Sequence, residues 1–250
     1  MKTVAKKTLR KYGIFGAARY CFHLLKSVRA RLKRLLRDGS KIRTYLSSHE
    51  VKKLHLGAGS NSLPGWLNSD LDPSLSSDVI YLDATKPFPV KDCIFDYVFS
   101  EHMIEHVTYP EGLHMLKECH RVLKPGGKIR IATPDLLFLI ELYQPNKTGL
   151  QKAYIRWSTD VHDEIQSRGS YEDTFVINNF MKAWGHRFIY DEKVLRRTLE
   201  KAGFSFVVRR GLHESEDEEL RGLENQARMP AGFLDLETMV LEAEKLGIDT

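Results

Sequence analysis

The residues most able to do chemistry in this sequence are two glycines and a series of acids, each set following a short apolar stretch. Gly57 and Gly59 follow an apolar stretch that ends at Leu56, and Asp70, Asp72 and Asp83 follow the next two stretches. Glycines without a Cβ let a bound group approach the backbone and its N–H groups. A carboxylate at the end of the next strand can accept hydrogen bonds from both hydroxyls of a ribose. This spacing predicts a nucleoside-containing cofactor.

These residues need a parallel sheet to bring them together. Strands alternating with helices predict an α/β fold, a Rossmann-like, doubly wound and mostly parallel seven-stranded sheet with helices on both faces. The expected strands are Val51–Leu56, Trp66–Leu71, Val79–Leu82, Ile94–Ser100, Lys128–Ala132, Phe204–Arg209 and, as strand rather than helix, Glu237–Lys245. Helices are expected over Pro110–Leu123 and, after an Asp191 N-cap, to Ala202. Because few residues separate Leu56 from Trp66, the helix between them is expected to be a single turn.

The chain divides into an N-terminal arm and one domain. Residues 1–50 hold fourteen Lys and Arg against two acids, so the remainder has a net charge of −7 within a total of +5. Residues 10–37 form a basic amphipathic helix by pattern, suited to peripheral contact with an anionic membrane, to contact with a nucleic acid, or to covering part of its own domain with a solvated basic face. Residues 39–49 are expected to be a linker. Residues 51–250 are the predicted domain, in which 135–185 form a helical, aromatic insertion expected to be a lid over an acceptor site. Glu214–Glu219 is expected to be an acidic surface run.

Composition narrows the classes of protein. No stretch in the arm supplies the ~20 apolar residues of a membrane span. Cys21, Cys93 and Cys119 lack the spacing of a disulfide framework or a thiolate metal site, so a cytoplasmic location is expected, with peripheral membrane contact through the arm. The acidic remainder disfavours a nucleic-acid groove. The pattern G-x-G-x-x-G is not met, because Ser62 stands at its third position, which disfavours a dinucleotide.

Five motifs, in order, resemble those of class I S-adenosylmethionine (SAM) dependent methyltransferases. They are Leu56-Gly-Ala-Gly-Ser60, Asn68-Ser-Asp-Leu-Asp72, Asp83-Ala-Thr-Lys-Pro-Phe88, Phe95-Asp-Tyr-Val-Phe-Ser100 and Arg121-Val-Leu-Lys-Pro-Gly-Gly127. More narrowly, Pro64-Gly-Trp-Leu-Asn68 and Gly185-His-Arg-Phe188 resemble the type 11-like branch of small bacterial methyltransferases. The resemblance implies SAM as cofactor and transfer of its methyl group to a small-molecule or glycan acceptor.

The resemblance also implies roles for individual residues. Leu56, Gly57, Ala58 and Gly59 would surround the methionine part, Asp70 or Asp72 would hold the ribose, Asp83 with Ala84 would contact the adenine, and Ser100 with Glu101 would line the face of methyl transfer. If the acceptor must lose a proton, the candidate bases are His102, His106 and His186.

Two alternatives compete with this interpretation. A SAM-fold chain without catalysis, tethered by its basic arm, would have the same cofactor motifs. Residues 102–106 also match H-x-x-E-H, in which two histidines on one helix face bind the zinc ion of a hydrolase. No third zinc ligand is identifiable from the sequence, so no metal site is predicted.

Overall fold

The computed structural model describes residues 36–74, 76–161 and 170–247. The chain separates into two compact units, Met1–Ser48 and His49–Thr250. In the first unit, residues 36–48 are helical, with Asp38, Ile42 and Tyr45 buried. The linker expected from residue 39 onward is therefore wrong up to residue 48, because buried positions recur there at helical spacing. Most of the predicted arm helix, 10–35, lies outside the described residues. Among those that are described, no helix is long and apolar enough to cross a membrane.

The second unit is built on a seven-stranded sheet in the order β3-β2-β1-β4-β5-β7-β6. The parallel strands are β1 (Lys53–Leu56), β2 (Leu67–Asp70), β3 (Ile80–Tyr81), β4 (Phe95–Glu101) and β5 (Leu123–Pro134). The sheet ends with β7 (Thr238–Glu244), antiparallel to both β5 and β6 (Ser205–Arg210). This confirms the predicted α/β class and sheet, including the strand assignment of the last element.

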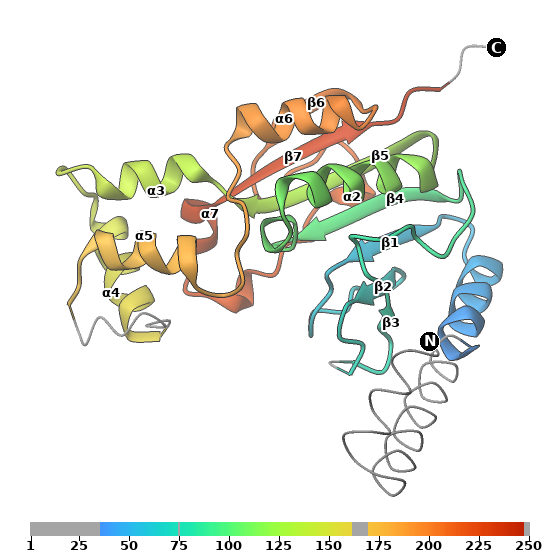
Figure 1. Ribbon diagram of the computed structural model, residues 1–250, viewed down its shortest axis with the longest axis horizontal. Helices are drawn as coiled ribbons and strands as arrows, with labels where there is room; N and C mark the ends of the chain where they lie inside the picture. The colour runs from blue at the N-terminus through green and yellow to red at the C-terminus, as the bar shows by residue number, and fades with distance from the viewer. Residues whose placement is uncertain (1–35, 75, 162–169, 248–250) are drawn as a thin grey trace, which may run out of the picture. The chain divides into compact units, whose positions relative to one another are not determined.

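One face of the sheet is covered by two helices, α2 (Tyr109–Val122) and α6 (Glu192–Lys201) (Figure 1). Helix α2 begins at Thr108, whose backbone N–H donates to the Glu111 carboxylate at 2.9 Å. Helix α6 begins at Asp191, which accepts from the Val194 N–H at 2.7 Å, as the sequence predicts. Gly203, with φ of +106°, follows the end of α6 in a conformation that favours glycine.

The other face is covered by residues 211–229, which contain only the short 3₁₀ helices η2 (Glu218–Leu220) and η3 (Gln226–Arg228), so the expectation of helices on both faces is wrong for this part of the sheet. Leu220 packs there against Trp66 and Phe99. The predicted acidic surface run lies in this segment, and three of its acids, Glu216, Asp217 and Glu219, are ion-paired to cations of the domain. Asp217 contacts Lys128 at 2.8 Å, for example, so the run is part of the sheet's cover.

The connection from β1 to β2 contains no helix, so the predicted helical turn is wrong. Residues 57–66 form turns, and the Asn68 side chain stabilises them. Asn68 accepts from the Leu63 N–H at 2.9 Å and donates to the carbonyls of Leu63 and Trp66 at 3.0 and 3.2 Å. A side-chain amide therefore satisfies backbone groups that a helix would have satisfied internally.

An inserted group of helices lies beyond the carboxyl ends of β4 and β5 (Figure 1). It comprises α3 (Leu136–Tyr143), α4 (Gly149–Val161) and α5 (Asp173–Lys182). These helices and the short α7 (Phe233–Glu237) share an apolar core that includes Phe138, Leu142, Tyr154, Phe180 and Phe233. The insertion thus has a core of its own while facing the end of the sheet where ligands bind in open α/β folds.

Candidate functional site

The glycine turn after β1 has a backbone that larger residues would strain. Gly57 and Gly59 have φ of +70° and +53°. An alanine Cβ at Gly57 would lie 2.5 Å from the Met103 Cγ, whereas one at Gly59 would have no atom within 4 Å. The turn is fixed to β2 by the Ala58 N–H, which donates to the Ser69 carbonyl at 3.0 Å. Open space beside Gly59 leaves room for a bound group to approach the backbone.

The two acids after β2 occupy different environments. Asp70 lines a cavity of about 370 Å³, here called the Asp70 cavity, and its Oδ2 accepts from the Gly59 N–H at 2.9 Å. Asp72 is exposed and accepts from the Ser74 hydroxyl at 2.6 Å, and this bond holds the pKa of Asp72 below its ordinary value. The sequence leaves both acids as candidates for the ribose, and their environments differ because β2 ends at Asp70 and the chain turns before Asp72.

The Asp70 cavity also contains other residues singled out from the sequence. Its lining includes Leu56, Gly57, Gly59, Asp83 and Ala84. Asp83 accepts from the Thr85 N–H and hydroxyl at 3.0 and 2.6 Å, which fixes the turn after β3. Three consecutive strand ends thus meet in one cavity.

A second cavity of about 290 Å³, the glycine-turn cavity, lies on the other side of the turn. It is lined by Ala58, Glu101, Asn225 and Arg228, among others. Glu101 is buried and accepts from the Asn225 N–H at 3.0 Å. Burial raises the pKa of Glu101, although nearby His102 and the bond from Asn225 act in the opposite direction. This cavity therefore offers an acid and an arginine, a charge pattern suited to the zwitterionic end of an amino acid.

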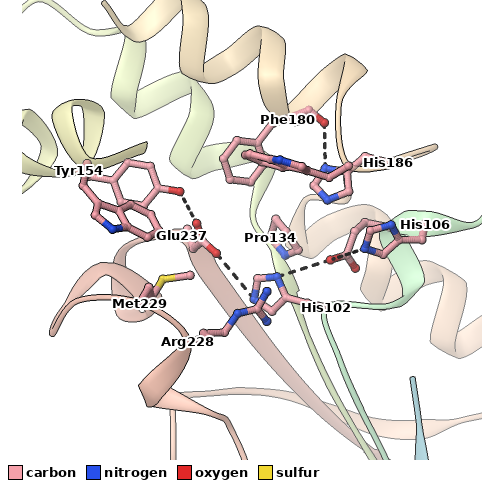
Figure 2. Close-up of a pocket in the computed structure, with 12 residues that line it drawn as sticks. His102, His106, Pro134, Tyr154, Phe180, His186, Arg228, Met229 and Glu237 are labelled. Carbon is pink, nitrogen blue, oxygen red and sulfur yellow. Dashed lines mark hydrogen bonds and ion pairs between the residues drawn. The ribbon is translucent and has the colours of Figure 1, made fainter. Parts of the chain in front are cut away.

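A third cavity of about 260 Å³, the aromatic cavity, lies between the sheet and the inserted helices (Figure 2). Its walls include Tyr154, Trp157, Phe180 and Trp184, all from the predicted lid segment. Tyr154 donates a hydrogen bond to Glu237, and burial together with this carboxylate raises the Tyr154 pKa well above its ordinary value. The tyrosine hydroxyl is thus kept protonated.

His102 borders all three cavities. It follows β4 with a φ of +46°, an uncommon conformation for a residue with a side chain. Its Nε2 lies 2.9 Å from the Thr238 hydroxyl and 3.8 Å from a Glu237 oxygen, while its Nδ1 lies 3.5 Å from Glu105 Oε1. Two carboxylates therefore flank this imidazole, one on each side of the ring.

The other two candidate histidines lie together in the aromatic cavity. The rings of His106 and His186 have centroids 4.9 Å apart. His186 Nδ1 lies 2.9 Å from the Phe180 carbonyl. Burial lowers the pKa of His186 and favours its neutral form. The structure thus brings all three predicted base candidates into one cavity.

The segment 102–106 does not have the geometry that the zinc-hydrolase interpretation requires. Only Ile104–His106 is helical there, as a three-residue 3₁₀ helix, and His102 precedes it with a left-handed backbone. Histidines at i and i+4 share a face on an α-helix, which this segment does not form. The H-x-x-E-H interpretation is therefore wrong.

Ser100 is separated from the other predicted site residues. Strand alternation turns Ser100 and Glu101 to opposite faces of β4, and only Glu101 is among the residues that line the three cavities of the described domain. Ser100 is buried, with its hydroxyl unpaired within the described structure. The expectation that it lines the transfer face does not agree with this placement.

Several lining residues had no signal in the sequence. Asn225 and Arg228 belong to the irregular segment 211–229, and Glu237 belongs to the short helix before β7. None of these residues lies in a motif or at a periodic position. Only the topology of the sheet brings them near the glycine turn.

SAM fits the residues of these cavities. The open space at Gly59 suits the approach of the cofactor to the backbone, and the Asp70 carboxylate suits its ribose. Glu101 and Arg228 carry opposite charges that suit the methionine end. The two cavities that would hold its two ends share Gly57, Gly59 and His102.

Comparison with known proteins gives a family for the central part of the chain. Residues 55–131 match the family model described as a methyltransferase domain. Demethylmenaquinone methyltransferases of Bacillus cereus (strain B4264) and Bacillus anthracis (strain CDC 684 / NRRL 3495) are each 37% identical over 67 residues, which are 27% of this chain and 24% of theirs. The chain thus matches about a quarter of the length of these curated relatives.

Solved structures with a similar chain path include two described as SAM-dependent methyltransferases. One, a possible histamine N-methyltransferase from Thermotoga maritima, is 18% identical with a TM-score of 0.45, over 89% of this chain and 95% of that one. The other, from Mesorhizobium loti, is 14% identical with a TM-score of 0.49, over 78% and 90% of the two chains.

Proposed function

We propose that this chain, whose residues 55–131 belong to the methyltransferase-domain family, moves a methyl group from SAM to a small-molecule acceptor. The observation that carries the proposal is the position of His102, which borders the Asp70, glycine-turn and aromatic cavities at once. A cofactor lying across the first two cavities would direct its central sulfonium toward this junction. The acceptor would then enter from the aromatic cavity.

The cofactor would be held by groups of opposite character at its two ends. Asp70 would accept hydrogen bonds from the ribose hydroxyls, and Asp83 with Ala84 would contact the adenine edge. Glu101 would pair with the ammonium group of the methionine end, and Arg228 would pair with its carboxylate. Charge-assisted hydrogen bonds of this kind contribute about 1.5–3 kcal/mol each.

The chain would contribute mainly alignment to the reaction. When bound, SAM supplies an activated methyl group on a sulfonium that leaves as a neutral thioether. Holding the acceptor in line with this methyl group contributes up to ~7–11 kcal/mol in the best intramolecular models. For an acceptor that must lose a proton, we propose His102 as the base, because it borders all three cavities and the carboxylates of Glu105 and Glu237 flank its ring.

The acceptor would be a small molecule that carries a ring. Trp157, Phe180 and Trp184 provide aromatic surfaces that suit a planar ring or the apolar face of a sugar. The curated relatives are named for demethylmenaquinone, which makes quinone-like rings one class to screen, and glycans are the other.

An acceptor screen with isotopically labelled SAM tests this proposal. Labelled methyl should be transferred to a ring-bearing compound, and Trp184→Ala should raise the KM for that compound while leaving the Kd of S-adenosylhomocysteine unchanged. A variant that loses cofactor affinity instead would show that the aromatic cavity belongs to the cofactor. Leu150→Ala, at an exposed position of α4 that lines none of the three cavities in the described domain, is the control.

A further inference from the structure

Glu105, His106 and His186 form a cluster, of which the methyl-transfer proposal uses only Glu105, as a neighbour of His102. One ligand-type atom from each residue lies within 4.8 Å of the other two. Two of the residues come from the turn after β4 and one follows α5, so the fold, not sequence proximity, brings them together. We propose that these three residues bind a divalent transition-metal ion at the wall of the aromatic cavity.

Glu105 has a buried carboxylate oxygen that lacks a hydrogen-bond donor in the described part of the chain. Its side chain is completely buried, and its Oε2 accepts from the Thr133 hydroxyl at 3.1 Å. Its Oε1 has no hydrogen-bond donor among the described residues, and the ring nitrogens beside it are His102 Nδ1 at 3.5 Å and His106 Nε2 at 4.0 Å. A buried carboxylate oxygen without a hydrogen bond is costly, and a bound cation would compensate for that cost.

The hydrogen bond of His186 fixes which of its ring nitrogens carries the proton. A carbonyl oxygen can only accept, so the 2.9 Å contact between His186 Nδ1 and the Phe180 carbonyl places the ring proton on Nδ1. The Nε2 lone pair is then free to bind a metal, with the ring orientation fixed by that hydrogen bond. Metal-ligating histidines characteristically donate their second nitrogen to a backbone carbonyl or a carboxylate in this way. Figure 2 shows His186 bonded to Phe180 on one side, with His106 on the other.

The dimensions of the cluster suit a transition metal after a small closure. Metal–ligand bonds of about 2.0–2.1 Å in a tetrahedral site place the ligand atoms roughly 3.4 Å apart. Because the ligand atoms now lie within 4.8 Å of one another, side-chain rotations that shorten these distances by little more than 1 Å would bring them to the spacing of a tetrahedral site. His106 has 40% of its side chain exposed, so its ring has room to move.

The donor set indicates which metals bind. Two imidazoles and one carboxylate favour Zn²⁺, Fe²⁺ or Co²⁺ over Mg²⁺ and Ca²⁺, which prefer oxygen ligands. Three protein ligands leave at least one coordination position open toward the cavity. If the proposed function holds, that position would bind an acceptor oxygen and orient it toward the methyl group.

Titration of the full-length, chelator-treated chain with Zn²⁺ alone, and separately with Mg²⁺ alone, tests the site by calorimetry. We expect one Zn²⁺ per chain and no saturable Mg²⁺ binding. Glu105→Gln, which keeps the size of the side chain, and His186→Ala should each weaken Zn²⁺ binding by at least about tenfold. His49→Ala is the control, since His49 is not among the residues that line the aromatic cavity.

Zn²⁺ affinity unchanged in both variants, or Mg²⁺ binding as strong as Zn²⁺ binding, would overturn the site. Far-UV circular dichroism of each variant shows whether it is folded. If His186→Ala does not fold, the Zn²⁺ affinity of Glu105→Gln alone tests the site. Titration of the same samples with S-adenosylhomocysteine separates the two proposals: its binding without Zn²⁺ binding would refute the metal site and leave the proposed function intact.

Discussion

Removing the buried Arg130 should destabilise the domain and release the segment that completes the glycine-turn cavity. Arg130 on β5 has no exposed side-chain surface. Its Nε donates to Glu224 and its Nη1 to Glu242, both at 2.6 Å, and Nη1 also donates to the Glu214 carbonyl at 2.8 Å. Glu224 directly precedes Asn225, so this ion pair fixes residues 211–229 to the sheet.

The size of the stability loss follows from the buried carboxylate that Arg130→Met leaves without its partner. Glu224 would stay fully buried, with the His213 backbone N–H at 2.9 Å and the His213 Nδ1 at 3.4 Å as its remaining polar contacts. Breaking a buried ion pair by removing one partner costs about 3–5 kcal/mol. A double variant with Glu224→Gln removes the unpaired charge as well, so it should recover part of that loss.

Urea unfolding followed by circular dichroism measures these free energies. The two single variants and the double variant form a thermodynamic cycle in which a non-zero coupling energy is expected. Arg37→Met, in the separate unit 1–48, is the control. A loss below about 1 kcal/mol for Arg130→Met, or additive effects in the cycle, would refute the reasoning.

Three further predictions concern the cofactor cavities. Gly57→Ala should cost more stability than Gly59→Ala in thermal unfolding: both add about 1–2 kcal/mol of left-handed strain, but only the alanine at 57 would meet a methionine side chain, at 2.5 Å. Equal losses would contradict this. Asp70→Asn should weaken binding of S-adenosylhomocysteine about 10- to 100-fold in calorimetry, while Asp72→Asn, on an exposed acid, should not change it. The reverse order would move the ribose role to Asp72. Burial lowers the pKa of His55 to about 4 from 6.5, so the unfolded chain binds the proton first as pH falls. Stability contributed by neutral His55 should thus be present above pH 6.5 and decrease by about 3 kcal/mol toward pH 4. His55→Gln should remove this component, and an unchanged pH profile in urea unfolding would count against it.

The cofactor half of the domain could be predicted from its sequence because local signals and topology agree there. A glycine turn after Leu56 and acids after the next two strands indicate one parallel sheet edge, and Asp70, Asp83 and Ala84 do lie in one cavity. Residues 55–131 match the family model of a methyltransferase domain, which agrees with the resemblance of the sequence motifs to class I methyltransferases.

The acceptor side could be predicted only in outline. Aromatic residues such as Trp157 and Trp184 indicate an apolar helical insertion, but spacing does not reveal whether they form a core or a cavity wall, and the structure uses them for both. Asn225 and Arg228 could not be found, because an irregular segment has no periodicity. The choice between Asp70 and Asp72 depended on where β2 ends, which a pattern of alternating residues does not determine.

The acidic segment and the first connection both depend on side-chain contacts that the sequence pattern does not reveal. Asp217 has the neighbours of a solvated acidic run, yet it pairs with Lys128 and accepts from the Tyr97 hydroxyl at 3.1 Å. The connection after β1 dispenses with a helix because Asn68 satisfies its backbone. The Asp217 contacts join positions that only the folded sheet brings together, whereas Asn68 and Leu63 lie within one short stretch of the chain.

Calorimetric titration of the full-length chain with S-adenosylhomocysteine, with NAD as the comparison ligand, tests the central claim most directly. The account predicts saturable binding of one S-adenosylhomocysteine per chain, lost in Gly57→Ala, and no binding of NAD. Absence of S-adenosylhomocysteine binding by the folded chain, or saturable binding of NAD in its place, would contradict it.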